Sequence, residues 1–275
     1  MLGINTLRYF YRQMMIRKYR FGAHIFSFDG VKIVLDFAYP VHRSIYLRRE
    51  FEPELTRVLK RAVRPGDVFV DIGANFGWYT NWLLVKEPAL RAVYAFEPLP
   101  AIFALLERSL RANRCEGRCV AQQLAVGAKP GTLSIKKFAG LDPMHASFYP
   151  LADLPFEEEE VCVEPLDALV KEMAAVPAVI KCDVEGAERE VLLGSARLMA
   201  GAFGPPPLWF LEANYETAAM AGYFPWELAE IAAPYGYKGY TIRDSHVVEL
   251  RSNKGLRHND VLILAIPASH RDRLV

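Results

Sequence analysis

Acidic residues and glycines lie at the ends of two short apolar runs, in a pattern that could hold a ligand. Asp71 ends the first run, and Gly73 and Gly77 follow it in a turn that precedes a predicted helix. Glu97 ends the second run. In open α/β sheets, ligands bind at the carboxyl ends of the strands. These four residues are therefore predicted to face one ligand.

The turn over residues 73–77 lacks the spacing of a dinucleotide-binding loop. That fingerprint has glycine at its first, third and sixth positions, whereas Asn75 and Trp78 occupy the third and sixth positions here. A pyrophosphate requires close backbone approach at those glycines, and an acid such as Asp71 suits a cation better. S-adenosylmethionine carries a sulfonium and an ammonium group and no phosphate. The pattern favours this cofactor, with a nucleotide-binding oxidoreductase as the alternative.

The predicted cofactor site extends to the next two strands. Glu97 is placed to accept hydrogen bonds from both ribose hydroxyls of an adenosine, because one carboxylate can accept two such bonds. Ala125 and Val126 end the third strand and could contact the adenine ring or pack in the core. The residues predicted to bind the cofactor are Asp71, Gly73, Asn75, Gly77, Tyr79, Thr80, Glu97, Pro98, Ala125, Val126 and Asp183.

Helices and strands alternate from residue 51 onward, which predicts the sheet that positions these residues. Strands are predicted at 67–72, 91–96, 120–126, 178–182 and 208–211, with helices between them. Such alternation is typical of an α/β protein with a doubly wound, Rossmann-like and mostly parallel sheet. Two last strands, at 240–242 and 261–266, predict an antiparallel hairpin at one edge.

Two segments depart from this alternation and define the predicted domain organisation. Residues 1–50 are predicted to form an N-terminal extension, with a basic helix over 1–20 and a hairpin over 24–36. Residues 51–275 form the main domain, with an inserted hairpin and long loop at 127–164. Long loops in compact domains are often functional.

The first 20 residues contain basic side chains and no acidic one. Ile4, Leu7, Tyr11 and Met14 recur at spacings that place them on one face of a helix. The helix could dock on the domain, or it could contact an anionic membrane surface or a partner. No run of about 18 apolar residues predicts a spanning helix, and the charges interrupt any signal-peptide core.

Composition narrows the classes of partner. The formal net charge of +1 gives no electrostatic reason to expect nucleic acid. The four cysteines lack the spacing of a zinc site, which is typical of reduced thiols in a cytoplasmic protein. We therefore expect a cytoplasmic protein whose contact with a membrane, if any, is peripheral.

Several phrases of the sequence, in order, resemble the FkbM family of methyltransferases. They are Arg64-Pro65-Gly66-Asp67, Asp71-Ile72-Gly73-Ala74-Asn75, Phe96-Glu97-Pro98, Ala125-Val126-Gly127 and Ile180-Lys181-Cys182-Asp183-Val184-Glu185-Gly186-Ala187-Glu188. Cys182 replaces the aliphatic residue usual in the family. The resemblance implies a class I methyltransferase sheet and S-adenosylmethionine as methyl donor. It implies an acceptor hydroxyl on a sugar, glycan, glycolipid or polyketide-like molecule. A non-catalytic binding module with the same fold is a further alternative.

Methyl transfer to a hydroxyl requires a group that accepts its proton. Asp183 and Glu185 follow the fourth strand and are candidates for this base. His145, in the inserted loop, and His258, near the last strand, are also candidates. Alternatively, the protein only positions the two reactants.

A metal ion is another way to activate the hydroxyl. Asp183 follows the fourth strand, while Glu212 and Asn214 follow the fifth. Oxygen ligands on adjacent strand ends resemble the magnesium arrangement of catechol O-methyltransferase, and Mg²⁺ prefers oxygen ligands. These three residues are the predicted ligands of Mg²⁺.

Overall fold

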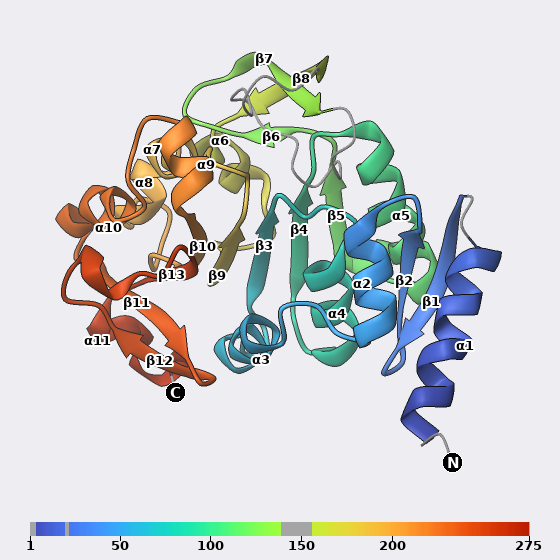
Figure 1. Ribbon diagram of the computed structural model, residues 1–275. Helices are drawn as coiled ribbons and strands as arrows, with labels where there is room; N and C mark the ends of the chain where they lie inside the picture. The colour runs from blue at the N-terminus through green and yellow to red at the C-terminus, as the bar shows by residue number, and fades with distance from the viewer. Residues whose placement is uncertain (1–3, 20–21, 139–155, 275) are drawn as a thin grey trace.

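The computed structural model describes residues 4–19, 22–138 and 156–274, and its largest sheet has eight strands (Figure 1). The strand order is β12-β11-β13-β10-β9-β3-β4-β5. The parallel strands are β3 (Val68–Ile72), β4 (Ala92–Phe96), β5 (Cys119–Gln122), β9 (Val179–Cys182) and β10 (Leu208–Asn214). This confirms the predicted doubly wound, mostly parallel sheet.

Helices cover both faces of this sheet because its central strands are apolar on both sides. Every residue of β3 is buried, with Phe69 packing in one core and Val70 in the other. The first core includes α3 (Pro53–Ala62), α4 (Trp78–Lys86) and α5 (Pro100–Asn113). The second includes α6 (Leu166–Leu169), α7 (Glu188–Leu193), α8 (Ala196–Met199), α9 (Tyr215–Met220) and α10 (Glu227–Ala232). The chain changes direction between β3 and β9, and a crevice is expected at that switch point.

The C-terminal edge differs in detail from the predicted hairpin. The two predicted strands are β11 (Lys238–Arg243) and β13 (Asn259–Ala265), and they pair antiparallel as expected. However, β13 lies between β10 and β11, and the edge is formed by β12 (His246–Glu249), which was not predicted. The chain ends with the short helix α11 (Pro267–His270).

The inserted segment forms a small second sheet. Its strands are β6 (Ala125–Val126), β7 (Gly131–Phe138) and β8 (Phe156–Glu164), in the order β6-β8-β7. The predicted strand 120–126 is therefore divided, because Ala125 and Val126 pair with β8 while β5 pairs with β4. Glu157 and Glu158 of β8 lie opposite Lys137 and Lys136 of β7. Lys137 Nζ also lies 2.8 Å from a carboxylate oxygen of Glu159.

The predicted N-terminal hairpin consists of β1 (Ala23–Phe28) and β2 (Val31–Asp36). Asp29 and Gly30 at its turn both have positive φ, 47° and 83°, as a tight hairpin turn requires. The hairpin packs on α4 and α5, and the Val34 N–H donates to Ser109 Oγ at 2.9 Å. A helix that was not predicted, α2 (Pro40–Arg48), follows it.

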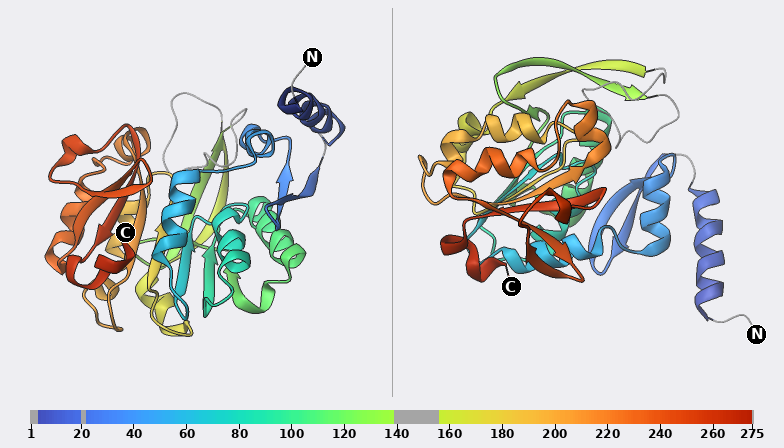
Figure 2. Two further views of the ribbon diagram at one scale, coloured as in Figure 1. Left: turned by 90° about the horizontal axis from the view of Figure 1, so that it is seen from below. Right: turned by 60° about the vertical axis from the view of Figure 1, so that its left-hand side comes forward.

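The predicted basic helix is α1 (Ile4–Lys18), which lies at the edge of the molecule beside α2 (Figures 1 and 2). Ile16 and Tyr19 pack against the core. Two residues of the predicted apolar face point away from the core, since Tyr11 is 56% and Met14 57% exposed. Lys18, which is also exposed, lies one helical turn after Met14, so the outward face is both apolar and basic.

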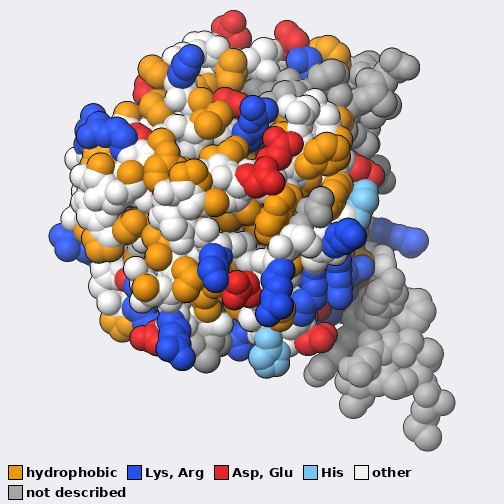
Figure 3. All heavy atoms as spheres, turned by 90° about the vertical axis from the view of Figure 1, so that its left-hand side faces the viewer, with side chains coloured by type: hydrophobic (Ala, Val, Ile, Leu, Met, Phe, Trp, Pro, Cys, Tyr) orange, Lys and Arg blue, Asp and Glu red, His pale blue; other side chains and the backbone are white. Residues whose placement is uncertain are grey.

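The face over α7, α10 and the C-terminal strands carries side chains of both charges (Figure 3). Lys and Arg side chains gather toward its lower part, with acidic and apolar side chains among and above them. Among the described residues, no helix has the length and apolar character needed to span a membrane. The four cysteines form no disulfide.

Candidate active site

The turn after β3 brings three strand ends into contact. Gly73 has a φ of 70°, and a Cβ atom there would lie 1.8 Å from the carbonyl oxygen of Asp183. The Gly73 N–H donates to the carbonyl of Phe96 at 3.0 Å. Glycine is therefore required here, because any side chain would separate the ends of β3, β4 and β9.

A first cavity lies over the ends of β3 and β4, beside the switch point of the sheet. The predicted cofactor-binding residues that line it are Gly73, Asn75, Tyr79, Glu97, Pro98, Ala125, Val126 and Asp183. Phe51, Ile102 and Leu124 contribute apolar surface. Sequence and structure thus place a cavity with acidic and apolar walls where a ligand of this sheet should bind.

Three predicted cofactor contacts support this cavity without lining it. The Asp71 side chain is fully buried and accepts a hydrogen bond from Thr80 Oγ1 at 2.6 Å, because alternation along β3 turns it toward α4. Gly77 starts α4, and a Cβ atom there would lie 2.5 Å from Leu106 Cδ1. These residues therefore do not line the first cavity, and their contact with the cofactor stays a prediction.

A buried lysine, which the sequence-based reasoning did not assign, lies beneath the cavity. Lys181 Nζ donates to the Gly73 carbonyl at 3.0 Å and lies 3.2 Å from Asp183 and 3.7 Å from Asp71. Burial alone would lower the pKa of Lys181, but the carboxylates of Asp183 and Asp71 outweigh it and hold that pKa above its usual range. The sequence does contain a signal for this ion pair, namely a lysine inside an apolar strand. A charged side chain is almost never fully buried without a partner.

Glu97 is held rigidly at the carboxyl end of β4. Its Oε2 accepts from the Asn75 N–H at 3.0 Å and its Oε1 from the Leu99 N–H at 2.9 Å. Burial raises the pKa of Glu97 to about 7, although both backbone hydrogen bonds oppose the rise. Each oxygen retains a second lone pair, so Glu97 can still accept the two ribose hydrogen bonds predicted for it.

Glu188, in the motif after β9, shapes the loop that carries Asp183 and Glu185. Its Oε1 accepts from the Val184 N–H at 2.9 Å, and its Oε2 accepts from the Tyr223 hydroxyl at 2.8 Å. Glu188 is 1% exposed. It therefore orients the loop from within the core.

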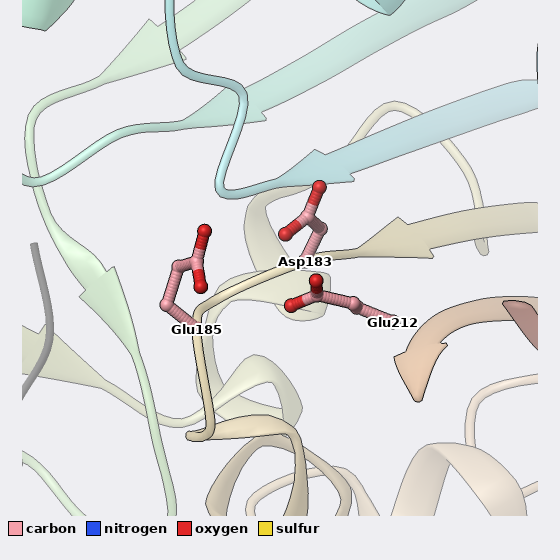
Figure 4. A group of neighbouring side chains, drawn as sticks. All are labelled: Asp183, Glu185 and Glu212. Carbon is pink, nitrogen blue, oxygen red and sulfur yellow. The ribbon is translucent and has the colours of Figure 1, made fainter. Parts of the chain in front are cut away.

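Asp183, Glu185 and Glu212 form a carboxylate cluster at the ends of β9 and β10. One oxygen from each lies within 4.8 Å of the others, and Figure 4 shows the three carboxylates converging. Burial, together with the charge of Asp183, raises the pKa of Glu185 to about 9. The same two causes raise the pKa of Glu212 well above its usual range.

Asn214, the third predicted magnesium ligand, has a different role. Its Oδ1 accepts from the Glu216 N–H at 2.9 Å and caps α9. Asparagine is a preferred helix N-cap, and the capping geometry uses the oxygen that a metal would need. Glu185, which was not among the predicted magnesium ligands, lies with Asp183 and Glu212 in the carboxylate cluster.

A second cavity adjoins the first at Asp183 and Lys181, which line both. It lies between the start of α3 and strands β10, β11 and β13. Glu212, Arg257 and Glu52 line it, and the last two had no predicted role. The Tyr79 hydroxyl donates to the Glu52 carboxylate and so connects the walls of the two cavities.

Of the two histidine candidates, the described one, His258, lines neither cavity. His145 lies outside the described residues. His258 is exposed, with Nε2 3.5 Å from a carboxylate oxygen of the equally exposed Glu216. Among the described candidates, Asp183 and Glu185 therefore remain as bases.

Part of this chain is similar to known methyltransferases. Residues 71–202 match the model of the methyltransferase FkbM domain. The 31-O-demethyl-FK506 methyltransferase FkbM of Streptomyces tacrolimicus is 30% identical over 161 residues, which cover 48% of this chain and 60% of that protein. Methyltransferase 1 of Beauveria bassiana (strain ARSEF 2860) is 27% identical over 191 residues, covering 62% of this chain and 71% of that protein.

A solved structure of methyltransferase FkbM from Methylobacillus flagellatus KT is also similar. It is 16% identical, has a TM-score of 0.48, and is matched by 96% of this chain over 60% of its own length. The chain therefore spans 60% of the first relative and 60% of this structure. The doubly wound, mostly parallel sheet is Rossmann-like. The match of residues 71–202 to the FkbM domain model confirms the resemblance seen in the sequence.

Proposed function

We propose that this chain transfers a methyl group from S-adenosylmethionine to a hydroxyl of a small-molecule acceptor. The observation that carries the proposal is that two cavities meet at Asp183. The first has the features of a donor site, and the second lies where a nucleophile could reach the donor. The match to a methyltransferase domain favours this reading over the oxidoreductase alternative.

The first cavity suits a cationic donor. Glu97, Asp183 and Glu185 line it, and Ala125 and Val126 offer apolar surface for the adenine ring. Negative side chains favour the sulfonium and ammonium groups of S-adenosylmethionine. These contacts support binding of the donor as the function of the first cavity.

The second cavity suits an uncharged acceptor with hydroxyl groups. It combines carboxylates, including Glu52 and Glu212, with apolar side chains such as Leu55 and Phe210. Sugars, glycans, glycolipids and polyketide-like molecules offer both hydroxyl groups and apolar surface to such a cavity. The Streptomyces relative is named as a 31-O-demethyl-FK506 methyltransferase. The proposed acceptor class is a hydroxyl compound of this kind.

Asp183 is the proposed base for the reaction. The acceptor oxygen attacks the sulfonium methyl carbon in line, the carbon–sulfur bond breaks, S-adenosylhomocysteine leaves, and the hydroxyl proton passes to Asp183. Asp183 is preferred to Glu185 as the base because Asp183 lines both cavities, whereas Glu185 lines the first and not the second. Holding two reactants in line lowers a barrier by about 7–11 kcal/mol in the best cases. Mg²⁺ is the alternative to direct proton transfer, with Asp183 and Glu212 among its ligands.

The test combines labelled donor with fractionated acceptors. The protein is incubated with methyl-labelled S-adenosylmethionine and with separated glycan, lipid and small-molecule fractions, and the labelled product is identified. Label on the oxygen of a hydroxyl compound supports the proposal. Donor binding without transfer to any fraction contradicts it and favours the non-catalytic binding module.

We also propose a cytoplasmic location with peripheral membrane contact through residues 1–20. The outward face of α1 supports this, since Tyr11 and Met14 are exposed there beside Lys18. Apolar and basic side chains on one helical face suit an anionic lipid surface.

A further inference from the structure

We infer that Asp183, Glu185 and Glu212 form a divalent-cation site at the boundary between the two cavities. The binding itself follows from the arrangement of these side chains. Only its role in methyl transfer rests on the proposed function.

The spacing of the carboxylates fits a single ion. One oxygen from each residue lies within 4.8 Å of the others. Two oxygens bound to one Mg²⁺ or Ca²⁺ ion at about 2.0–2.6 Å can lie at most about 4–5 Å apart. The three side chains come from two adjacent strand ends and converge on a common space (Figure 4). Small side-chain rotations would bring all three into coordination range.

An oxygen of Glu212 lacks a partner in this cluster. Its Oε2 is buried and accepts no hydrogen bond from any residue in the described part of the chain. Figure 4 shows this carboxylate directed toward Asp183. Buried polar atoms without partners are rare, and an ion that the structure does not contain is one recognised explanation.

Lys181 does not compensate the charge of Glu212. Within the described residues, its ion pairs are with Asp71 and Asp183, and its ammonium also donates to the Gly73 carbonyl. A buried carboxylate requires a countercharge or a proton. A divalent cation would supply that charge to Glu212.

The location connects the ion to both reactants. Asp183 lines both cavities, Glu185 lines the first, and Glu212 lines the second. Three protein ligands leave positions open on an ion that takes six or more oxygens. An acceptor hydroxyl bound at such a position would lose its proton more readily, as metal-bound water does.

Mn²⁺ is the probe for this site, because its spectrum changes when it binds. The full chain, without donor, is titrated with Mn²⁺ at neutral pH and followed by electron paramagnetic resonance. One equivalent is expected to bind, and Mg²⁺ should displace it. Loss of a ligand in Glu212→Gln or Glu185→Gln should cost at least the roughly 10- to 100-fold in affinity that loss of an outer-shell partner costs. Glu216→Gln, which changes an exposed acid on the neighbouring helix, should bind like the wild type.

The outcomes separate this site from the proposed function. Absence of Mn²⁺ binding to the wild type at millimolar concentration, or equal affinity in both cluster variants and the wild type, overturns the site. Melting temperatures show whether each variant folds, and either folded variant is sufficient for the comparison. Calorimetry with S-adenosylmethionine is run in parallel. Failure to bind the donor with Mn²⁺ binding intact would refute the methyltransferase proposal and leave the cation site standing.

Discussion

Single side chains in this protein gain their roles from neighbours in space. Glu97 is fixed by two backbone N–H groups, and Asp183 is held by Lys181. Lys181 is itself neutralised by two carboxylates. Such mutual support keeps polar and charged side chains oriented in the site. Changes to single residues should therefore have effects that differ between binding and turnover.

Glu97→Ala should weaken binding of S-adenosylmethionine by about 1.5–3 kcal/mol, the range for hydrogen bonds to a charged group. Isothermal titration calorimetry of the folded variant measures this loss. In the wild type, affinity should rise as pH increases through about 7, because the pKa of Glu97 is raised to about 7 and the carboxylate is the better acceptor.

Glu97→Gln is the matched control, since it keeps the shape of the side chain and cannot titrate. Its affinity for the donor should not vary with pH over that interval. An unchanged affinity in Glu97→Ala would remove Glu97 from the donor site.

Asp183→Asn should lower turnover by about 10²–10⁴-fold, the usual worth of general acid–base help. The amide keeps the size of the side chain but cannot accept the proton. Initial rates with the acceptor found by labelling measure the loss, and Glu216→Gln should keep wild-type turnover. Near-normal rates in Asp183→Asn would show that Asp183 is not the base and would leave Glu185 and His145 as candidates.

At the scale of elements, α1 differs from the helices that cover the sheet. Ile16 and Tyr19 attach it to the core, and Arg12 donates to the carbonyl of Leu47 at 2.6 Å. Tyr11 and Met14, on its outer side, are exposed. The helix can therefore be changed on its outer side without disturbing the donor site.

Replacing Arg17 and Lys18 by glutamate should weaken binding to anionic vesicles by about 2 kcal/mol or more, at roughly 1 kcal/mol for each basic residue near the surface. Donor affinity should not change, and deletion of residues 1–20 should have the same two effects. Sedimentation with phosphatidylserine vesicles at low and high salt measures the binding. A wild-type chain that does not sediment with vesicles at low salt would show that α1 is a docked structural helix.

At the scale of the whole molecule, the C-terminal segment is fastened to the main sheet by specific contacts. His270 Nδ1 accepts from the Ile266 N–H at 3.0 Å, so its Nε2 carries the proton and donates to the Pro206 carbonyl at 3.0 Å. Arg273 pairs with Asp67 through two hydrogen bonds. These contacts stabilise the antiparallel strands that border the second cavity.

His270 should make stability depend on pH. Burial lowers the pKa of His270, so the unfolded chain binds its proton more readily than the folded one. The stabilisation that neutral His270 gives the folded chain is complete above the pKa of about 6.5 that histidine has when unfolded. It is lost as the pH falls toward the lowered pKa of the folded state. Urea unfolding of the wild type and His270→Ala should differ by about 1–3 kcal/mol near pH 8, through unsatisfied backbone groups.

The difference between the two proteins should shrink as the pH falls below about 6. Taking this difference cancels the contribution of the other titrating groups. A difference that stays constant with pH would show that His270 does not titrate in the folding transition.

The sequence by itself determined most of the helices and strands and the glycine-containing turn over residues 73–77. Apolar runs and helix signals are local, so they predicted the strands that carry Asp71, Glu97 and Asp183, and helix α5 was predicted with its observed bounds. The order of motifs identified the family, because the residues of each motif are close together in the chain.

Only the tertiary structure decided which side chains meet. The insertion of β13 beside β10, the pairing of Lys181 with Asp71, and the second cavity all depend on strand order and register between distant segments. Asn214 illustrates the limit, since a residue at the right strand end was used as a helix cap. Spacing along the chain predicts which strand end a residue occupies. The direction of its side chain follows from pleat and packing, which place Glu185 beside Asp183 and Glu212.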